Sequence, residues 1–189
     1  MKMLLELPIR TQRLELRDFQ LTDFDAVHEY RSDPEVTRFM FFEPDTTADT
    51  EWYLDSILET QRAEPRQVWE LAVVDTADSR LVGGCDLTLE NSREADLGYI
   101  LARRAWGKGY GTEIARALVE RGFSDLGLDR IFATCDRENH ASRRVLEKAG
   151  LLFESTLIHH KFTKSRWWDS ELYALTRKDW SAAARHGIP

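Results

Sequence analysis

The chain has 189 residues and a mass of 22.0 kDa, a size that fits one domain because chains divide at roughly 100 to 200 residues per domain. Hydrophobic residues make up 42% of it and aromatic residues 11%, which excludes a disordered chain. The net charge of −7 argues against partners that need a broad cationic face, so we expect neither nucleic acid nor a membrane surface.

Cysteine usage and the N-terminus narrow the class further. Cys85 and Cys135 lie far apart and outside any CxxC or Cys/His spacing, which argues against a disulfide framework and against a metal site. Glu6 and Pro8 interrupt the apolar run near the start, unlike a signal peptide. No stretch approaches the roughly 18 apolar residues of a membrane helix. We expect a cytoplasmic protein.

The first half of the chain predicts a strand, two helices and three further strands. Residues 13–17 alternate polar and apolar like a half-buried strand, and helical spacing follows Thr22 and again over residues 49–62. Three β-rich runs come next, joined by short turns, and predict an antiparallel meander. These runs are residues 68–74, 81–89 and 95–101.

The second half begins with glycines at 107–111 and continues with the clearest amphipathic helix of the chain, from Thr112 onward. A strand over 130–135 and a helix over 141–149 follow, the helix ended by Gly150 at its C′ position. Residues 151–158 and 172–175 predict closing strands. The expected fold class is therefore α+β, with a mixed, mostly antiparallel sheet flanked by helices, in one domain over residues 1–189.

The glycine segment is the strongest functional signal. Gly107, Gly109 and Gly111 alternate with larger residues just before a helix, so several backbone N–H groups can face one anion, most plausibly a phosphate. A P-loop needs GK[ST] and a dinucleotide fingerprint needs a sixth-position glycine, and this spacing provides neither. A flexible turn built of small residues is the alternative.

Arg104-x-x-Gly107-x-Gly109 resembles the RxxGxG pyrophosphate loop of the GCN5-related N-acetyltransferases (GNAT), the acyl-CoA-dependent amine acetyltransferases. Segments elsewhere resemble the RimJ/RimL branch, which acetylates N-terminal alanines of ribosomal proteins. They are TQRLELR (11–17), DLGYIL (96–101), WGKGYGTE (106–113), NHASRRVLEKAG (139–150) and WWDSELYAL (167–175). The resemblance implies that acetyl-CoA is the co-substrate, that no metal takes part, and that a central strand splays from its neighbour at a bulge to receive the pantetheine arm.

The resemblance also implies a set of cofactor contacts. Arg104 and Lys108 would add charge beside the diphosphate, although both suit a solvated surface equally well. Asn139 and Ser142 would reach the pantetheine and the thiol, and the alternative for Asn139 is a helix cap. The full expected set is Ile100, Leu101, Arg104, Trp106, Gly107, Lys108, Gly109, Tyr110, Gly111, Thr112, Asn139 and Ser142.

Two catalytic roles follow from the resemblance. Asp96, at the start of the central strand, would help to deprotonate the amine, with Glu94 and Glu70 as substitutes. Many relatives carry a tyrosine acid where this chain has Leu146, so Ser142 would instead act on the leaving thiolate. The expected reaction is direct transfer of acetyl to a primary amine.

The identity of the acceptor is the least determined part of this expectation. A protein N-terminal amino group is the first candidate, and a small amine such as a polyamine, an amino acid or a drug is the second. A non-catalytic acyl-CoA-binding module is the alternative from another class. A homodimer is compatible with these expectations.

Overall fold

The computed structural model describes residues 4–185. Its helices are α1 (Phe24–Arg31), α2 (Pro34–Thr37), α3 (Thr47–Thr60), α4 (Tyr110–Ser124), α5 (His140–Lys148) and α6 (Arg177–Arg185). Its strands are β1 (Ile9–Arg10), β2 (Leu14–Asp18), β3 (Val68–Asp75), β4 (Arg80–Leu89), β5 (Glu94–Leu101), β6 (Arg130–Asp136), β7 (Leu152–Thr163) and β8 (Arg166–Thr176).

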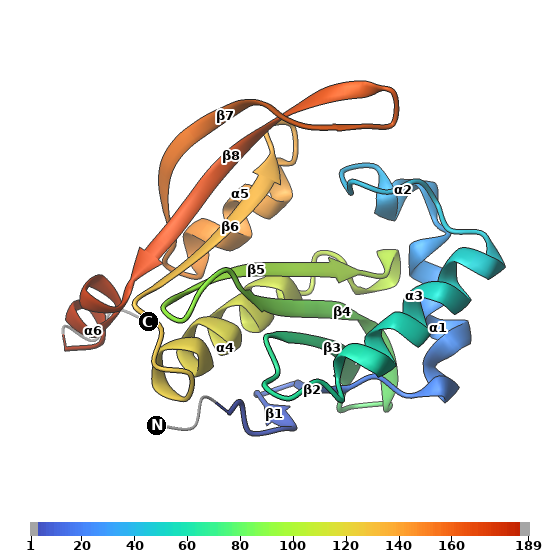
Figure 1. Cartoon of the computed structure of the whole chain (residues 1–189), viewed down its shortest axis with the longest axis horizontal. Coiled ribbons are helices and arrows are strands. Elements are labelled where there is room, and N and C mark those ends of the chain that lie inside the picture. Colours follow the sequence, from blue (N-terminus) through green and yellow to red (C-terminus); the bar gives the residue numbers. More distant parts are fainter. Residues whose placement is uncertain (1–3, 186–189) are drawn as a thin grey trace.

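All eight strands form one sheet, in the order β1-β2-β3-β4-β5-β6-β8-β7 (Figure 1). Every neighbouring pair is antiparallel except β5 and β6, which run parallel. A parallel pair needs a long crossover, and here α4 supplies it between β5 and β6. The predicted α+β class and the mixed, mostly antiparallel sheet are confirmed.

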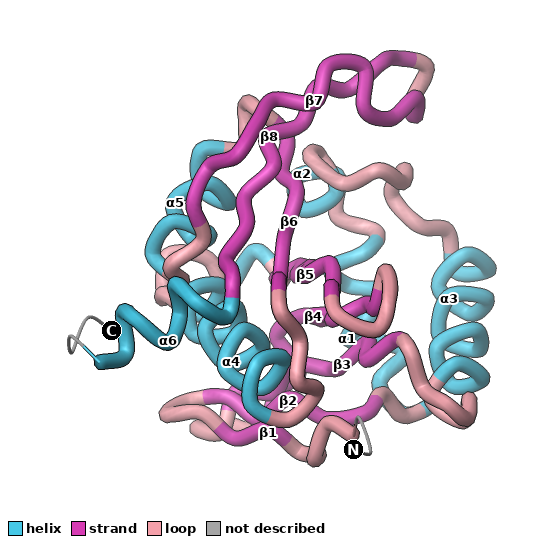
Figure 2. Tube along the Cα trace, turned by 60° about the vertical axis from the view of Figure 1, so that its left-hand side comes forward, coloured by secondary structure: helices cyan, strands magenta, loops and turns pink. Residues whose placement is uncertain are grey.

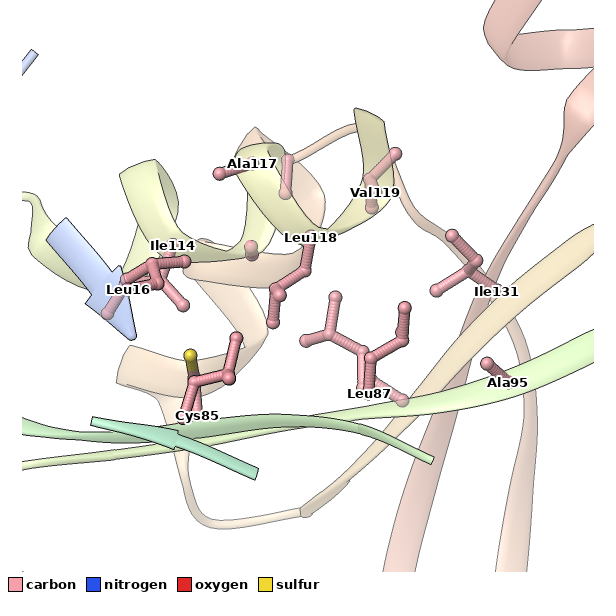
Figure 3. Close-up of a cluster of buried hydrophobic side chains, with 14 of the residues drawn as sticks. Leu16, Cys85, Leu87, Ala95, Ile114, Ala117, Leu118, Val119 and Ile131 are labelled. Atoms are coloured by element: carbon pink, nitrogen blue, oxygen red, sulfur yellow. The ribbon is translucent and has the colours of Figure 1, made fainter. Parts of the chain in front are cut away.

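The α4 face of the sheet holds the larger apolar core. Leu118 of α4 and Leu87 of β4 are both 0% exposed and point into the layer between helix and sheet (Figure 3). Burying a side chain of this size contributes about 1.5–3 kcal/mol. This layer fixes α4, and with it the glycine segment at the start of α4, against β4 and β5.

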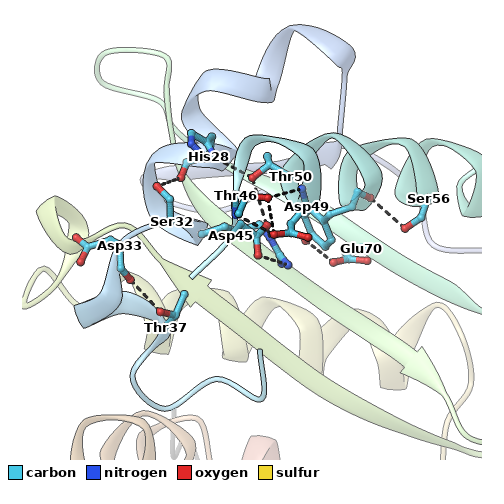
Figure 4. A network of polar contacts seen from close by, with 12 residues as sticks. His28, Ser32, Asp33, Thr37, Asp45, Thr46, Asp49, Thr50, Ser56 and Glu70 are labelled. Carbon is cyan, nitrogen blue, oxygen red and sulfur yellow. Dashed lines mark hydrogen bonds and ion pairs between the residues drawn. The ribbon is translucent and has the colours of Figure 1, made fainter. Parts of the chain in front are cut away.

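The opposite face carries α1 and α3 on a smaller apolar cluster, with polar contacts between the helices (Figure 4). Arg31 of α1 forms a bidentate contact with Asp45, whose Oδ2 lies 2.6 Å from Arg31 Nε. Thr50 of α3 donates to Asp45 at 3.2 Å and meets His28 Nδ1 at 2.8 Å. Asp45, in the segment between α2 and α3, therefore ties this segment to α1 and to α3.

The central strand splays as expected. β5 and β6 pair over only three positions, from Glu94↔Arg130 to Asp96↔Phe132, and then diverge (Figure 1). The expected bulge does not lie in β5, whose register with β4 runs without a shift from Ala95 to Leu101. Register shifts lie instead between β3 and β4, at Val73 and Val74, and at two places between β7 and β8. The splay arises because β6 leaves β5, and that expectation is corrected accordingly.

Several elements are longer than the sequence predicted or were not predicted at all. The closing strands are longer than predicted and form a hairpin that reaches beyond β6 (Figure 2). The strand β1, with two residues, and the helix α2, with four, are too short to show a period. α6 follows β8 directly and was not predicted. Gly150 has φ +95° just after α5 and confirms the predicted helix end.

Candidate active site

A cavity of about 630 Å³ opens where β5 and β6 diverge. Its wall includes both faces of β5, the start of α4, the first turns of α5 and the segment around α2. Because the splay interrupts the sheet, one cavity reaches from the α4 face to the α1 face. Eleven of the predicted residues line it: Asp96, Ile100, Leu101, Trp106, Gly107, Gly109, Tyr110, Gly111, Thr112, Asn139 and Ser142.

The glycine loop presents unpartnered backbone N–H groups to this cavity. Gly107 and Gly109 have φ +73° and +82°, values that disfavour residues with a Cβ. Gly109 is the N-cap of α4 and provides no side-chain cap. The first N–H groups of a 15-residue helix therefore point outward with the positive end of its dipole, which suits an anion.

Contacts from Arg13, just before β2, and from the end of β5 hold the loop in place. Glu113 accepts from Arg13 Nε and from the Arg13 backbone N–H, both at 2.8 Å, while Arg13 Nη1 donates to the Lys108 carbonyl at 2.8 Å. Trp106 Nε1 donates to the Leu101 carbonyl at 2.8 Å. The TQRLELR segment and the glycine loop are thus held together by direct hydrogen bonds.

Ser142 lies on the first turn of α5, where Asn139 is the N-cap. Asn139 Oδ1 accepts from the Ser142 N–H at 3.0 Å, so the capping interpretation of Asn139 is confirmed. Tyr99 of β5 donates its hydroxyl proton to Ser142 Oγ at 3.2 Å. Burial raises the pKa of Tyr99 to about 12, which keeps the phenol protonated at neutral pH.

Asp96 lies on β5 at the last position that pairs with β6 before the two strands diverge, and it faces the α1 side of the cavity. Burial raises its pKa to about 6, and the nearby ammonium of Lys161 opposes that rise. A carboxyl group with this pKa is largely ionised at pH 7 and accepts a proton readily. Its position and its proton affinity both suit a base.

Asp86 of β4 is a second carboxylate in the same cavity. It pairs with Gly98 of β5, and a Cβ at Gly98 would collide with Asp86 Oδ1. Burial, then the charges of Glu70 and Asp96, raise the pKa of Asp86 to about 7. The lack of a side chain at Gly98 thus leaves room for a half-buried carboxylate above the central strand.

The far wall of the cavity joins two distant parts of the chain. Lys161 of β7 lines it together with Phe41, and its Nζ lies 4.2 Å from the Phe41 ring centroid. Thr163 donates to the Phe41 carbonyl at 2.9 Å, and Lys164 Nζ donates to the Thr37 carbonyl at 2.8 Å. The hairpin tip is thereby fixed on the end of α2 and on the segment that follows it.

Four candidates from the sequence lie outside the cavity wall. Arg104 contacts Glu29 and donates to the Leu81 carbonyl at 2.7 Å. Lys108 Nζ lies 5.8 Å from the Tyr110 ring centroid. Glu70 accepts from Tyr53 of α3 (Figure 4), and Glu94 accepts from Asn91 Nδ2 at 3.4 Å. The structure brings none of these four side chains to the cavity.

Sequence reasoning missed Asp86, Tyr99, Cys135 and Lys161, all of which line the cavity. Asp86 carried a signal, because it is a lone carboxylate inside the apolar run LVGGCDLTL. Tyr99 lies within the quoted DLGYIL motif, but its partner Ser142 is 43 residues away. No local pattern reveals that pairing. Among residues 4–185 no cluster of three metal-ligating side chains is found, and no helix there has the length and apolar character to cross a membrane.

Comparison with known proteins identifies the family. Residues 13–152 match the sequence model of the acetyltransferase (GNAT) domain. The chain is 30% identical over 174 residues to the uncharacterized N-acetyltransferase p20 of Bacillus licheniformis, covering 90% of this chain and 97% of that protein. The chain therefore belongs to the GNAT superfamily. It is an N-acetyltransferase.

Solved structures agree with this family. A GNAT-family acetyltransferase from Bacillus anthracis has TM-score 0.81 and 29% identity, over 90% of this chain and 98% of that one. Two more distant structures share the fold. Spermidine N-acetyltransferase from Vibrio cholerae, in complex with CoA and spermine, has TM-score 0.77 and 20% identity over 90% and 99%. RimL, the ribosomal L7/L12 acetyltransferase in complex with CoA, has TM-score 0.76 and 18% identity over 90% and 97%.

Proposed function

We propose that this chain transfers the acetyl group of acetyl-CoA directly to a primary amine, with a protein N-terminal amino group as the acceptor. The observation that carries the proposal is the cavity through the β5–β6 splay. It joins the uncapped start of α4 on one face to Asp96 on the other. A thioester held along the splay would thus meet an amine arriving from the α1 side.

The residues of the α4 side fit acetyl-CoA. The N–H groups of residues 110–112 would bind the diphosphate at the positive end of α4. Beyond Asp96, β5 has no partner in β6, so the edge of β5 at Ile100 and Leu101 that faces away from β4 borders the space for the pantetheine arm, where the Leu101 carbonyl already accepts from Trp106 Nε1. A neutral arm beside unpaired strand groups satisfies them as a neighbouring strand would.

Asp96 and Ser142 divide the proton work. Asp96 helps to deprotonate the ammonium, since a free α-amino group has a pKa of ~7.7–8.0 and needs only a modest base. Tyr99 donates to Ser142 Oγ, which leaves the Ser142 proton free to donate to the sulfur as negative charge develops there. The attack of the amine on the thioester carbonyl then expels CoA as the thiol.

Two classes of acceptor are supported by different observations. The motifs quoted above resemble those of the RimJ/RimL branch, which favours a protein N-terminus. The structural likeness to an enzyme solved with spermine favours a small amine. The wall of the cavity contains both Asp96 and Lys161, so its local charge is mixed and does not by itself select a polyamine.

A CoA-release assay across short peptides and small amines tests the function, with mass spectrometry to locate the acetyl group. We expect acetylated peptide N-termini. Acetylation of small amines but of no peptide would identify a small amine as the acceptor. Binding of CoA without turnover of any amine would instead identify a non-catalytic acyl-CoA-binding module. Calorimetry with CoA and with NAD is the control, because binding of NAD without CoA would contradict the cofactor assignment.

A further inference from the structure

Asp86 is a cavity-lining acidic group for which the sequence motifs assign no role. Its hydrogen bond in the structure is a long one, from Thr88 Oγ1 at 3.3 Å. The charged groups that act on it from the neighbouring strands are Glu70 of β3 and Asp96 of β5, both acidic. None of the described basic side chains forms an ion pair with Asp86, and a half-buried carboxylate without one is costly unless a ligand supplies the positive charge.

The surroundings separate Asp86 from its neighbour Asp96. Lys161 of β7 acts on Asp96 and favours its ionised form, while Glu90 opposes this. Glu70 is held by Tyr53 of α3 and is acted on by Arg31 of α1. Asp86 lies between these two carboxylates, and no basic side chain of the described chain is among the groups that shift its pKa.

We propose that Asp86 binds the ammonium of the acceptor and takes its proton, in place of Asp96, to which the family resemblance gave this role and which stays ionised beside it. This rests on the proposed acetyltransferase function. The ammonium first gives one proton to Asp86, which passes it to water. The neutral amine then forms the N–C bond as the C–S bond breaks, and the second nitrogen proton goes to the thiolate, giving CoA thiol.

The position of Asp86 gives this proposal its geometry. Asp86 lies across from Gly98 at the point where β5 passes along the cavity. Since Gly98 offers no side chain, the carboxylate and the backbone of β5 border the same space. An amine bound there would lie beside the strand that we propose receives the pantetheine arm.

The decisive experiment compares kcat/KM against pH for the unmodified protein, Asp86→Asn and Asp96→Asn, with one peptide whose free N-terminal amine is the acceptor. We expect the unmodified protein to gain activity through an apparent pKa near 7. Asp86→Asn should lose about 10²-fold at pH 7 and recover toward pH 9, where the amine is already neutral. Asp96→Asn should keep the increase of kcat/KM through this pKa. The proposal would be overturned if Asp96→Asn lost this increase while Asp86→Asn kept it.

Thermal unfolding supplies a readout that needs no turnover. A carboxyl group whose folded pKa is raised binds more protons folded than unfolded between pH ~4 and 7, so it lowers stability as pH rises through that window. Asp86→Asn should therefore raise Tm by roughly 2–4 °C or more at pH 8 and leave it unchanged at pH 4. Equal Tm values at pH 8 would also overturn the proposal.

Controls separate failure of this proposal from failure of the function. Glu120→Gln removes an exposed carboxylate of α4 and should change neither profile. Calorimetry should show that Asp86→Asn binds CoA as the unmodified protein does. If the unmodified protein acetylates no amine at any pH, the proposed function fails, and the melting comparison still decides whether Asp86 carries an unfavourable buried charge.

Discussion

The two faces of the sheet are held by different physics. On the α4 face, fully buried aliphatic side chains such as Leu87 and Leu118 form a dry layer. On the α1–α3 face, Arg31 and Asp45 form a buried ion pair, with side chains 12% and 4% exposed. Arg31 also lies over the rings of Phe42 and Tyr53, at 4.1 and 3.6 Å from their centroids.

This difference matches the two sides of the cavity. The dry layer holds the glycine loop and β5, to which we assign acetyl-CoA. The polar network holds the segment between α2 and α3, which forms part of the cavity wall where we place the acceptor. Apolar packing tolerates aliphatic exchange, whereas an ion pair depends on both of its members.

The largest expected effect is on the polar face. Asp45→Ala should lower the free energy of unfolding by about 3–5 kcal/mol, because it leaves the Arg31 guanidinium buried without its carboxylate. Urea denaturation measures this. The double variant Arg31→Met/Asp45→Leu is the control, and it should recover most of the loss. A double variant as unstable as the single one would show that the pair itself stabilises the fold.

On the apolar face, Leu118→Ala should cost about 3 kcal/mol, from lost burial and from the cavity left behind. Leu118→Met conserves the volume and should cost less than about 1.5 kcal/mol. Urea denaturation again gives the numbers. If the two variants were equally unstable, the stability of the layer around α4 would depend on the shape of the Leu118 side chain and not only on its volume.

Ser142→Ala tests the co-substrate side of the reaction. It should lower kcat by up to ~10²-fold with little change in KM for acetyl-CoA, because proton donation matters only as the thiolate forms. Steady-state kinetics with two acceptors, a peptide and a small amine that are both turned over, check it. The loss should be the same for both. A loss confined to one acceptor would place Ser142 in acceptor binding instead.

Tyr99→Phe should have a smaller effect, a fall in kcat of about tenfold, since Ser142 keeps its own proton but loses the hydrogen bond that orients it. The matched measurement is the double variant with Ser142→Ala. It should be no slower than Ser142→Ala alone, because Tyr99 acts through that hydroxyl. Additive losses would give Tyr99 an independent role.

Cys135→Ala should leave turnover intact. Cys135 lines the cavity, but burial raises the pKa of its thiol to about 12, so the thiolate needed for a covalent acyl-enzyme is scarce. Cys85 is buried on the α4 face, its pKa is also raised by burial, and Cys85→Ala is the companion variant. Mass spectrometry after mixing with acetyl-CoA should find neither cysteine acetylated. An acetylated Cys135 would contradict direct transfer.

The sequence was most informative where function depends on the backbone. The glycines of the loop and the period of α4 predicted the turn and the helix that follows it, because positive φ values and helical spacing leave local patterns. The side of the cavity where we place the acceptor depends on pairings across the sheet, such as Asp86 opposite Gly98, which need the strand register. The local motif predicted Arg104 as a phosphate ligand, yet its guanidinium donates a hydrogen bond to Glu29, which lies 75 residues earlier in the chain.

The contact between the hairpin tip and the segment after α2 has a consequence for engineering. Thr163 and Lys164 bond carbonyls of Phe41 and Thr37, which are 122 and 127 residues earlier in the chain. One rim of the cavity, on the side where we place the acceptor, is therefore formed jointly by two segments that are far apart in the sequence. A chimera that receives only one of these segments from a relative would lose the contacts between them. Acceptor preference should therefore transfer only when both segments are exchanged together.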